Sequence, residues 1–221
     1  MRRKLSVRDW PQQERPLIKA KERGFQALSD AELLSILLRV NSYEQDEVTY
    51  AREVIGKAGS LRKLFEVPDL LPGHKRIELE AARELGRRLL KEGVIGQNFV
   101  RSPQAVTDYL SASLRDMKRE VFKVMFLDKA LRILGDKDLF IGTVDEAAVH
   151  PREVVKEALL QNASSIVLVH NHPSGKTEPS REDYEITQKI KAACLTVSVR
   201  VLDHIIIGEN QYYSFSERNS L

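Results

Sequence analysis

The sequence SSIVLVHNHPSGKTEPSRED, residues 164–183, is the stretch that decides the fold of the second half of the chain. Its first six residues form an apolar run that is typical of a buried strand. Pro173 ends the hydrogen-bonding ladder of that strand, and Ser174-Gly175 is favoured in turns. Ser180 is then a suitable N-cap for a helix that carries Asp183 in its first turn. The stretch therefore predicts a strand, a tight turn and a helix in succession.

Two histidines lie where this predicted strand ends. Side chains two residues apart on a strand point to the same face, so His170 and His172 are expected to project together. Asp183 can face back toward them from the helix. Taken singly, a strand-end histidine is usually solvated, and S-x-x-D at a helix start is usually a plain capping box. Together, two imidazoles and one carboxylate with a fourth position open are the ligand set of a catalytic zinc, Zn2+.

The same spacing resembles a family signature. His170-x-His172, seven further residues and Ser180-x-x-Asp183 are similar to the JAMM motif of the MPN+/JAB metalloproteases. The resemblance narrows to the bacterial RadC family, runs from about Glu14 to the C-terminus and is specific from Arg119 onward. The segments that carry it are VHPREVVKEAL (149–159), LVHNHPSG (168–175), EPSRED (178–183) and VLDHIIIG (201–208).

This resemblance implies a zinc-dependent metallohydrolase, of the peptidase or isopeptidase type, that acts on an unidentified protein or peptide. Zinc lowers the pKa of a bound water to about 7. Glu120 matches the position from which the JAMM family takes the general base that accepts the proton of this water. Ser180 matches the motif serine, whose hydroxyl in this family helps to hold the water and the oxyanion.

The first part of the chain shows helical patterns. Ser29 as N-cap and Glu32 three residues later form a capping box at a helix start. The apolar residues over 33–38 surround most of that helix, which is therefore expected to lie in a helical core. Further helices are predicted over 48–58 and 74–92. Since nothing here alternates with a period of two, this region is predicted to be all-helical.

From residue 120 onward, predicted strands alternate with helices, which is typical of an α/β domain. Before them, Ser102 as N-cap and Pro103 at the first helical position begin a helix. The other elements expected are strands over 121–127, 131–134, 139–142, 164–169, 197–207 and 211–215, and helices over 151–160 and 180–194.

These patterns and the resemblance together predict a two-part α+β chain. An all-helical N-terminal module is followed by an α/β domain of the JAB/MPN-like, cytidine-deaminase-like kind. The expected boundaries are a flexible leader at 1–13, a helical helix-hairpin-helix-like domain at 14–92, a linker at 93–101 and the JAMM/MPN+ zinc domain at 102–221.

An alternative function is DNA-associated, as the repair label of the RadC family suggests, with the zinc site secondary. A helix-hairpin-helix presents a Gly-rich hairpin and a helix N-terminus to DNA phosphate. In this chain the hairpin, residues 71–75, has the single glycine Gly73 where the family has G-x-G, and so offers one positive-φ position instead of two. Residues 14–92 are therefore either a weak DNA contact or a helical scaffold. A third possibility, a nucleotide-directed zinc deaminase, lacks the cysteine ligands and H-x-E of that class.

Composition excludes several classes of protein. The net charge of +3 over 221 residues is too small to argue for nucleic-acid binding by itself. No apolar run has the length of a membrane span, and the N-terminus lacks the apolar stretch of a secretory signal. The single cysteine, Cys194, has no partner for an internal disulfide and is expected to pack in a helix. We therefore expect a cytoplasmic protein without membrane contact, and the sequence leaves its oligomeric state open.

Three other polar residues in the second half of the chain are also considered. Asn171, between the two histidines, is interpreted as loop structure. His204, in the segment LDHII, either supports a metal ligand from behind or is a satisfied core or strand-end histidine, and the second interpretation is preferred. His150, at a helix start, is interpreted as structural.

Overall fold

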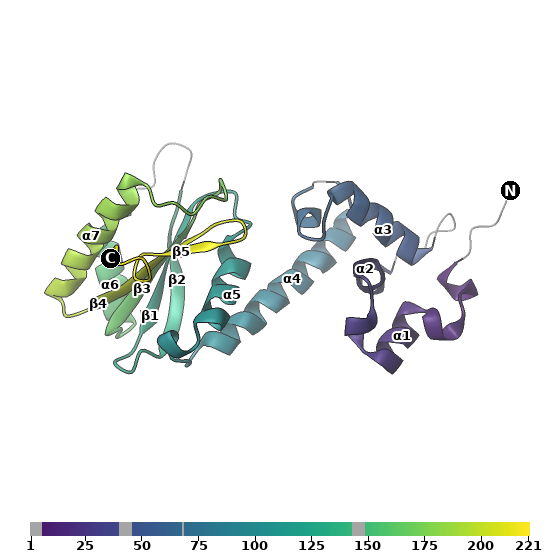
Figure 1. The fold of residues 1–221 in the computed structure, drawn as a ribbon, viewed down its shortest axis with the longest axis horizontal. Helices are drawn as coiled ribbons and strands as arrows, with labels where there is room; N and C mark the ends of the chain where they lie inside the picture. Colours follow the sequence, from purple (N-terminus) through teal and green to yellow (C-terminus); the bar gives the residue numbers. More distant parts are fainter. Residues whose placement is uncertain (1–5, 40–45, 68, 143–148) are drawn as a thin grey trace. The chain divides into compact units, whose positions relative to one another are not determined.

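The computed structural model describes residues 6–39, 46–67, 69–142 and 149–221 (Figure 1). The chain divides into two compact units, Met1–Gly86 and Arg87–Leu221, and the division falls within helix α4 (Gly73–Val94). The first unit is helical, and the second combines a mixed sheet with helices, which confirms the predicted two-part α+β fold. Within the described part of the chain, no helix has the length and the apolar character needed to cross a bilayer.

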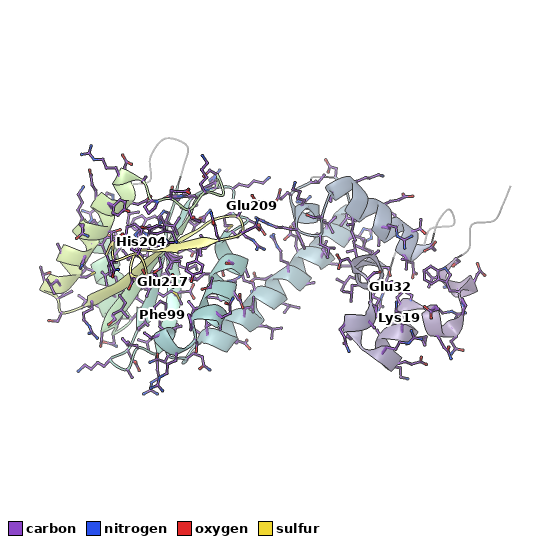
Figure 2. All side chains as sticks on the ribbon, in the orientation of Figure 1. Lys19, Glu32, Phe99, His204, Glu209 and Glu217 are labelled. Atoms are coloured by element: carbon purple, nitrogen blue, oxygen red, sulfur yellow. The ribbon has the colours of Figure 1, made fainter. Side chains whose placement is uncertain are left out.

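The first unit is built around the contact of two helices, α2 and α3. Leu34 and Leu38 of α2 are buried, as are Val48 and Val54 of α3. Beside this core Lys19 and Glu32 form an ion pair of 2.9 Å (Figure 2). The elements of this unit before α4 are η1 (Val7–Asp9), η2 (Gln12–Glu14), α1 (Pro16–Arg23), η3 (Phe25–Ala27), α2 (Asp30–Leu38), α3 (Glu47–Ala58) and η4 (Lys63–Phe65).

Helix ends in this unit follow local chemistry. The predicted capping box is confirmed, because Ser29 accepts from the backbone N–H of Glu32 while the Glu32 carboxylate accepts from the N–H of Ser29. The side chain of Asp46 caps α3 by accepting from the backbone N–H groups of Val48 and Thr49, and Gly59 ends this helix with a φ of 88°. Two 3-10 turns, η1 and η2, lie in the predicted leader, whose residues 1–5 are outside the described residues.

The segment that was expected to form a glycine hairpin is the start of α4. Gly73 is the first residue of α4 and is absent from the glycines that have a positive φ; in this turn the positive φ, 58°, belongs to Asp69. The expectation of a positive-φ hairpin at Gly73 is therefore wrong. Arg76 donates to the carbonyl oxygens of Val67 (3.1 Å) and Phe65 (3.2 Å), which fixes the approach of the chain to α4.

The second unit holds a five-stranded sheet in the order β2-β1-β3-β4-β5. The β3–β4 pair is parallel, and the other three pairs are antiparallel. Its strands are β1 (Val121–Leu127), β2 (Ile133–Ile141), β3 (Ser165–Asn171), β4 (Arg200–Ile207) and β5 (Tyr212–Ser214). The sequence patterns predicted β1 and β3 within two residues. In contrast, β2 is one strand instead of two pieces, and β4 begins three residues later than expected because Ser198 turns with a φ of 58°.

Helices cover both faces of this sheet (Figure 1). Val121 and Met125 of β1 belong to the core under α5 (Pro103–Leu114), whereas Phe122 and Val124 belong to the core under α6 (Pro151–Leu160) and α7 (Arg181–Thr196). Because both faces are covered, β1 and β3 are buried along their whole length and are mostly apolar, with Lys123 as the charged exception in β1.

Residues 93–101, expected as a linker, are held against the second unit. Val94 is buried in the core under α5, and Phe99 packs against it. The backbone N–H of Gly96 donates to the carbonyl of Ile133 (2.8 Å), at the start of β2. Ser102 precedes α5 as predicted, but its side chain makes no capping hydrogen bond.

A buried ion cluster lies between β1, β2 and α5. The carboxylate of Asp136 contacts Lys123 Nζ (2.6 Å), Lys91 Nζ (2.7 Å) and the hydroxyl of Tyr109 (2.9 Å). Burial raises the pKa of Asp136, but the two lysines more than offset this effect and hold the pKa below its ordinary value. The side chains of Lys123 and Asp136 are only 5% and 3% exposed. Removing either charge would therefore leave the other buried without its partner, which is strongly destabilising.

Replacing Asp136 by Asn is expected to lower the free energy of unfolding by about 3 kcal/mol, because Lys123 loses its buried anion. Asp138→Asn is the matched control: Asp138 also contacts Lys123 (2.6 Å) but its side chain is 41% exposed, so the cost is expected to be about 1 kcal/mol or less. Urea unfolding of the parent and both variants measures the difference. Equal losses of unfolding free energy in the two variants would contradict the greater role assigned to the buried Asp136.

Candidate metal centre

Three potential ligands meet where β3 ends and α7 begins. His170 is the penultimate residue of β3, His172 follows the strand, and Asp183 lies in the first turn of α7. Their ligand atoms all lie within 4.8 Å of one another. His170 Nε2 is 3.1 Å from Asp183 Oδ1, His172 Nε2 is 3.4 Å from Asp183 Oδ2, and the two Nε2 atoms are 3.0 Å apart. The structure thus brings together the three residues that the spacing of the motif indicated.

Asp183 is held in place by the helix cap. Ser180 donates to Asp183 Oδ2 from both its hydroxyl and its backbone N–H, each at 2.7 Å, and accepts from the backbone N–H of Asp183. Burial raises the pKa of Asp183, but the contacts with His170, His172 and Ser180 more than offset it and hold the pKa well below the usual range. The carboxylate is therefore charged, and Ser180 aims it at the histidines.

The imidazole of His172 is oriented by the loop that follows it. Its Nδ1 lies 3.0 Å from the carbonyl oxygen of Lys176, which can only accept a hydrogen bond, so Nδ1 is the donor and Nε2 faces Asp183. The hydrogen bond with Asp183 is the main reason that the pKa of His172 is raised. A proton on Nε2 here occupies the place that a metal ion would take, and metal binding would release it.

The donor set fits a divalent transition metal. In a tetrahedral site with metal–nitrogen distances of 2.0–2.1 Å, neighbouring ligand atoms are about 3.3 Å apart. The two histidine nitrogens are 3.0 Å apart, near this spacing, and Asp183 places one carboxylate oxygen beside each of them, Oδ1 at 3.1 Å from His170 Nε2 and Oδ2 at 3.4 Å from His172 Nε2. Two imidazoles and one carboxylate suit zinc, whereas magnesium and calcium prefer oxygen ligands. Each imidazole also has a hydrogen-bond partner for its other nitrogen, as ligating histidines usually do.

The ligand loop is packed against the turn between β4 and β5. The backbone N–H of His172 donates to the carbonyl of Ile207 (3.1 Å), and that of Glu209 donates to the carbonyl of Gly175 (3.0 Å). A Cβ on Gly208 would lie 2.5 Å from the Gly175 carbonyl oxygen and 2.5 Å from Thr177 Cγ2. Such contacts are too close, so only glycine allows the two loops to approach in this way.

Gly208→Ala is expected to destabilise the protein by about 1–3 kcal/mol, because the added methyl group must push the ligand loop away from β4. Gly135→Ala serves as the control, since a Cβ at Gly135 meets no atom within 4 Å. Thermal and urea unfolding of both variants measure the effect. If Gly208→Ala is as stable as the control, the close packing of the ligand loop does not constrain it.

The predicted general base lies directly before β1. Glu120 is exposed, and its backbone carbonyl accepts a hydrogen bond from Gly142 (2.7 Å). The charge of Glu120 contributes to the raised pKa of His172, although less than Asp183 does. This coupling means that the carboxylate of Glu120 acts electrostatically on one of the three ligands.

Asn171 connects the segment of Glu120 to the ligand strand. Its side chain is fully buried; Oδ1 accepts from the N–H of Val121 (2.8 Å), and Nδ2 donates to the carbonyls of Met117 and Arg119 (both 3.2 Å). The interpretation of Asn171 as loop structure is wrong, because it ends β3 and fixes the chain on both sides of Glu120. The position of Asn171 between the two histidines was the available signal, since its side chain must point to the opposite face of the sheet from theirs.

His204 of β4 supports His170 from behind. Its Nε2 lies 2.8 Å from His170 Nδ1, and its Nδ1 lies 2.6 Å from the hydroxyl of Thr187 (Figure 2 labels His204). Burial is the main reason that the pKa of His204 lies well below its ordinary value. His204 is thus a satisfied core histidine, the interpretation preferred from the sequence, and it also contacts a candidate ligand, as the alternative had it. Thr187 was missed altogether, although it lies one helical turn after Asp183 and so on the same face of α7.

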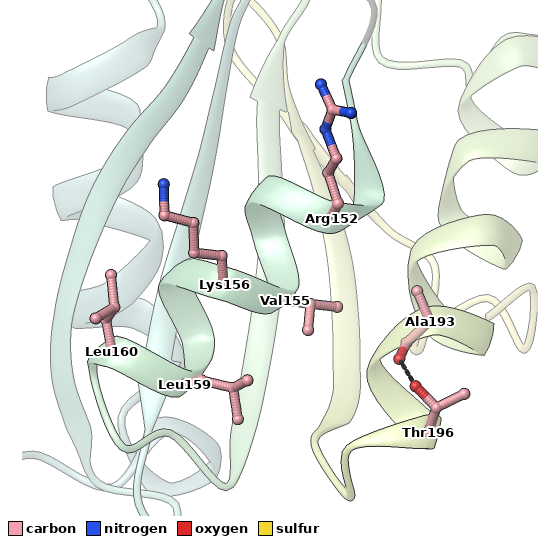
Figure 3. Close-up of a pocket in the computed structure, with 7 residues that line it drawn as sticks. All are labelled: Arg152, Val155, Lys156, Leu159, Leu160, Ala193 and Thr196. Atoms are coloured by element: carbon pink, nitrogen blue, oxygen red, sulfur yellow. Dashed lines mark hydrogen bonds between the residues drawn. The ribbon is translucent and has the colours of Figure 1, made fainter.

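A separate surface hollow lies between α6 and α7 (Figure 3). Its volume is about 740 Å³, and its lining is mainly apolar. The lining residues are Arg152, Val155, Lys156, Leu159, Leu160, Ala193 and Thr196. Its α7 residues lie in the last part of that helix, about 15 Å along the axis from Asp183 at a rise of 1.5 Å per residue. The hollow is thus distinct from the candidate metal centre.

Comparisons with known proteins cover both parts of the chain. A family model described as RadC-like JAB domain matches residues 100–220, and one described as UPF0758 N-terminal matches residues 7–75. A UPF0758 protein of Stutzerimonas stutzeri (strain A1501) is 46% identical over 220 residues, which cover 96% of this chain and 98% of the relative. One of Nitrosococcus oceani is 47% identical over 225 residues, with 98% and 100% covered.

Proposed function

Since the chain belongs to the RadC family of JAB-domain proteins, we propose that it is a zinc-dependent metallohydrolase of the peptidase or isopeptidase type. The observation that carries this proposal is the convergence of His170, His172 and Asp183 at one point of the second unit. The chemistry of the donors favours zinc among the common metals. An amide of a protein or peptide is the substrate class that the JAMM motif implies.

His170, His172 and Asp183 would hold the metal and leave one coordination position for water. Zinc in such a position supplies an acidified water near neutral pH. Glu120 would take the proton of that water and pass it to the leaving amine, which is the work of a general base and then a general acid. Its exposed position beside the start of β1 leaves it open to solvent and substrate.

Ser180 has two roles in this proposal. In the structure its hydroxyl donates to Asp183 Oδ2, so it orients a ligand. To stabilise an oxyanion, the hydroxyl would rotate away from Asp183. The backbone N–H of Ser180 would then still bind the same carboxylate oxygen, and the ligand would keep its orientation.

Purified protein is expected to contain about one zinc per chain, because three ligands converge on one position. His172→Ala removes one ligand and is expected to lose most of the metal, whereas His150→Ala alters an exposed histidine outside the triad and serves as the control. Elemental analysis of the three proteins after identical purification measures this. A parent protein without metal, even after reconstitution with zinc, would remove the basis of the proposed function.

Glu120→Gln is expected to keep the zinc and to lower the rate of amide hydrolysis by about 10²–10⁴-fold, because glutamine cannot accept the proton of the water. Glu182→Gln changes another exposed carboxylate, next to Asp183 on α7, and is expected to retain the rate. The assay uses a panel of fluorogenic peptide-bond and isopeptide-bond substrates, with zinc content determined in parallel. Unchanged hydrolysis by a zinc-loaded Glu120→Gln protein would disprove the role of Glu120.

DNA contact through residues 14–92 stays a prediction. Gly73 is helical, Arg76 donates to two backbone carbonyls, and Lys75 pairs with Glu78 at 3.0 Å, so none of these features singles out a phosphate site. A salt-dependent DNA titration of the full chain tests this alternative. The cytoplasmic location also stays a prediction.

A further inference from the structure

A buried chain of hydrogen bonds connects two of the candidate ligands behind the metal position. The hydroxyl of Thr187 donates to the backbone carbonyl of Asp183 (2.5 Å) and lies 2.6 Å from His204 Nδ1. His204 Nε2 in turn lies 2.8 Å from His170 Nδ1. Thr187, His204 and His170 are each fully buried. The chain therefore starts at the backbone of one ligand and ends at the imidazole of another.

The backbone carbonyl of Asp183 fixes which partner donates in each of these hydrogen bonds. A carbonyl oxygen can only accept, so the hydroxyl proton of Thr187 is used on Asp183. The hydroxyl oxygen must then accept from His204, which places a proton on His204 Nδ1. His204 is buried against Phe122 and Phe215, an environment that disfavours the charged form, so its Nε2 carries no proton. His204 Nε2 can then only accept, and His170 Nδ1 must donate to it.

We propose that Thr187 and His204 are positioning residues that keep the proton of His170 on Nδ1, so that Nε2 remains the nitrogen that binds the metal. This inference deepens the proposed function and rests on the metal site at His170, His172 and Asp183. His172 reaches the same result through the carbonyl of Lys176, and Thr187 extends the principle to the ligand inside the sheet. Both ligand imidazoles thus have their orientation set by a backbone carbonyl.

Loss of the Thr187 hydroxyl would allow the donor and the acceptor to exchange in the hydrogen bond between His204 and His170. In a Thr187→Val protein, which keeps the shape of the side chain, the Nδ1 proton of His204 has no acceptor. The proton of His204 then moves to Nε2 and donates to His170 Nδ1. His170 carries its own proton on Nε2, where Asp183 Oδ1 at 3.1 Å accepts it. Metal binding must undo this arrangement, so the affinity for metal falls.

Zinc affinity of full-length Thr187→Val, measured by competition with a chromophoric chelator, is expected to fall by about 10–100-fold. Thr187→Ser retains a hydroxyl and is the matched control, with an affinity expected to stay within about threefold of the parent. Unfolding curves of the three proteins establish that each is folded under the conditions of the titration. Equal affinities for the valine and serine variants would overturn the proposal.

A second measurement needs no variant. Two-bond ¹H–¹⁵N correlation spectra of ¹⁵N-histidine-labelled parent protein report which ring nitrogen carries the proton. We expect His204 to be protonated on Nδ1 alone and His170 to be protonated on Nδ1, with and without zinc. A proton on His204 Nε2 would overturn the proposed positioning of His170 by Thr187 and His204. The zinc-free spectrum alone shows which nitrogen of His204 carries the proton. Failure of the positioning proposal is therefore distinguishable from failure of the parent to bind zinc.

Discussion

The pairing of β3 on both sides is the constraint on which the rest of the second unit depends. β1 lies antiparallel along one edge of β3, and β4 lies parallel along the other. A strand so enclosed has no freedom to shift its register, since a shift of one residue would place His170 on the opposite face. Burial of the apolar residues before His170 fixes the register of β3. The register in turn determines where the imidazole of His170 lies.

Each candidate ligand is restrained by a different kind of local structure. His170 belongs to the sheet, His172 to a loop that is packed on Gly208, and Asp183 to a helix cap. All three elements meet because β3 ends where α7 begins, and the hydrogen bonds of Thr187 and His204 connect α7 back to the sheet. Orienting ligands with buried hydrogen bonds of this kind is common in metalloproteins, where it sets both the ring orientation and the affinity for the metal.

The sequence predicted the parts of the site that are local and left open those that depend on strand pairing. His170, His172 and Asp183 lie within 14 residues, and period-two geometry with one helix cap is enough to bring them together. His204 is 34 positions from His170, and only the parallel pairing of β3 with β4 makes them neighbours. β2 was predicted as two pieces for a similar reason, since its middle is polar. The side chain of Asp136 is buried there only because Lys123, on the neighbouring strand, pairs with it.

Asn171 has a consequence for thermal motion in the site. Sliding of β1 relative to β3 is the movement that would change the separation of Glu120 from the three ligands. The side chain of Asn171 holds both flanks of Glu120 to the end of β3 through three hydrogen bonds, and these must break together before such sliding can occur. The backbone that carries the exposed side chain of Glu120 is thus restrained by β3, the most deeply buried strand in the sheet.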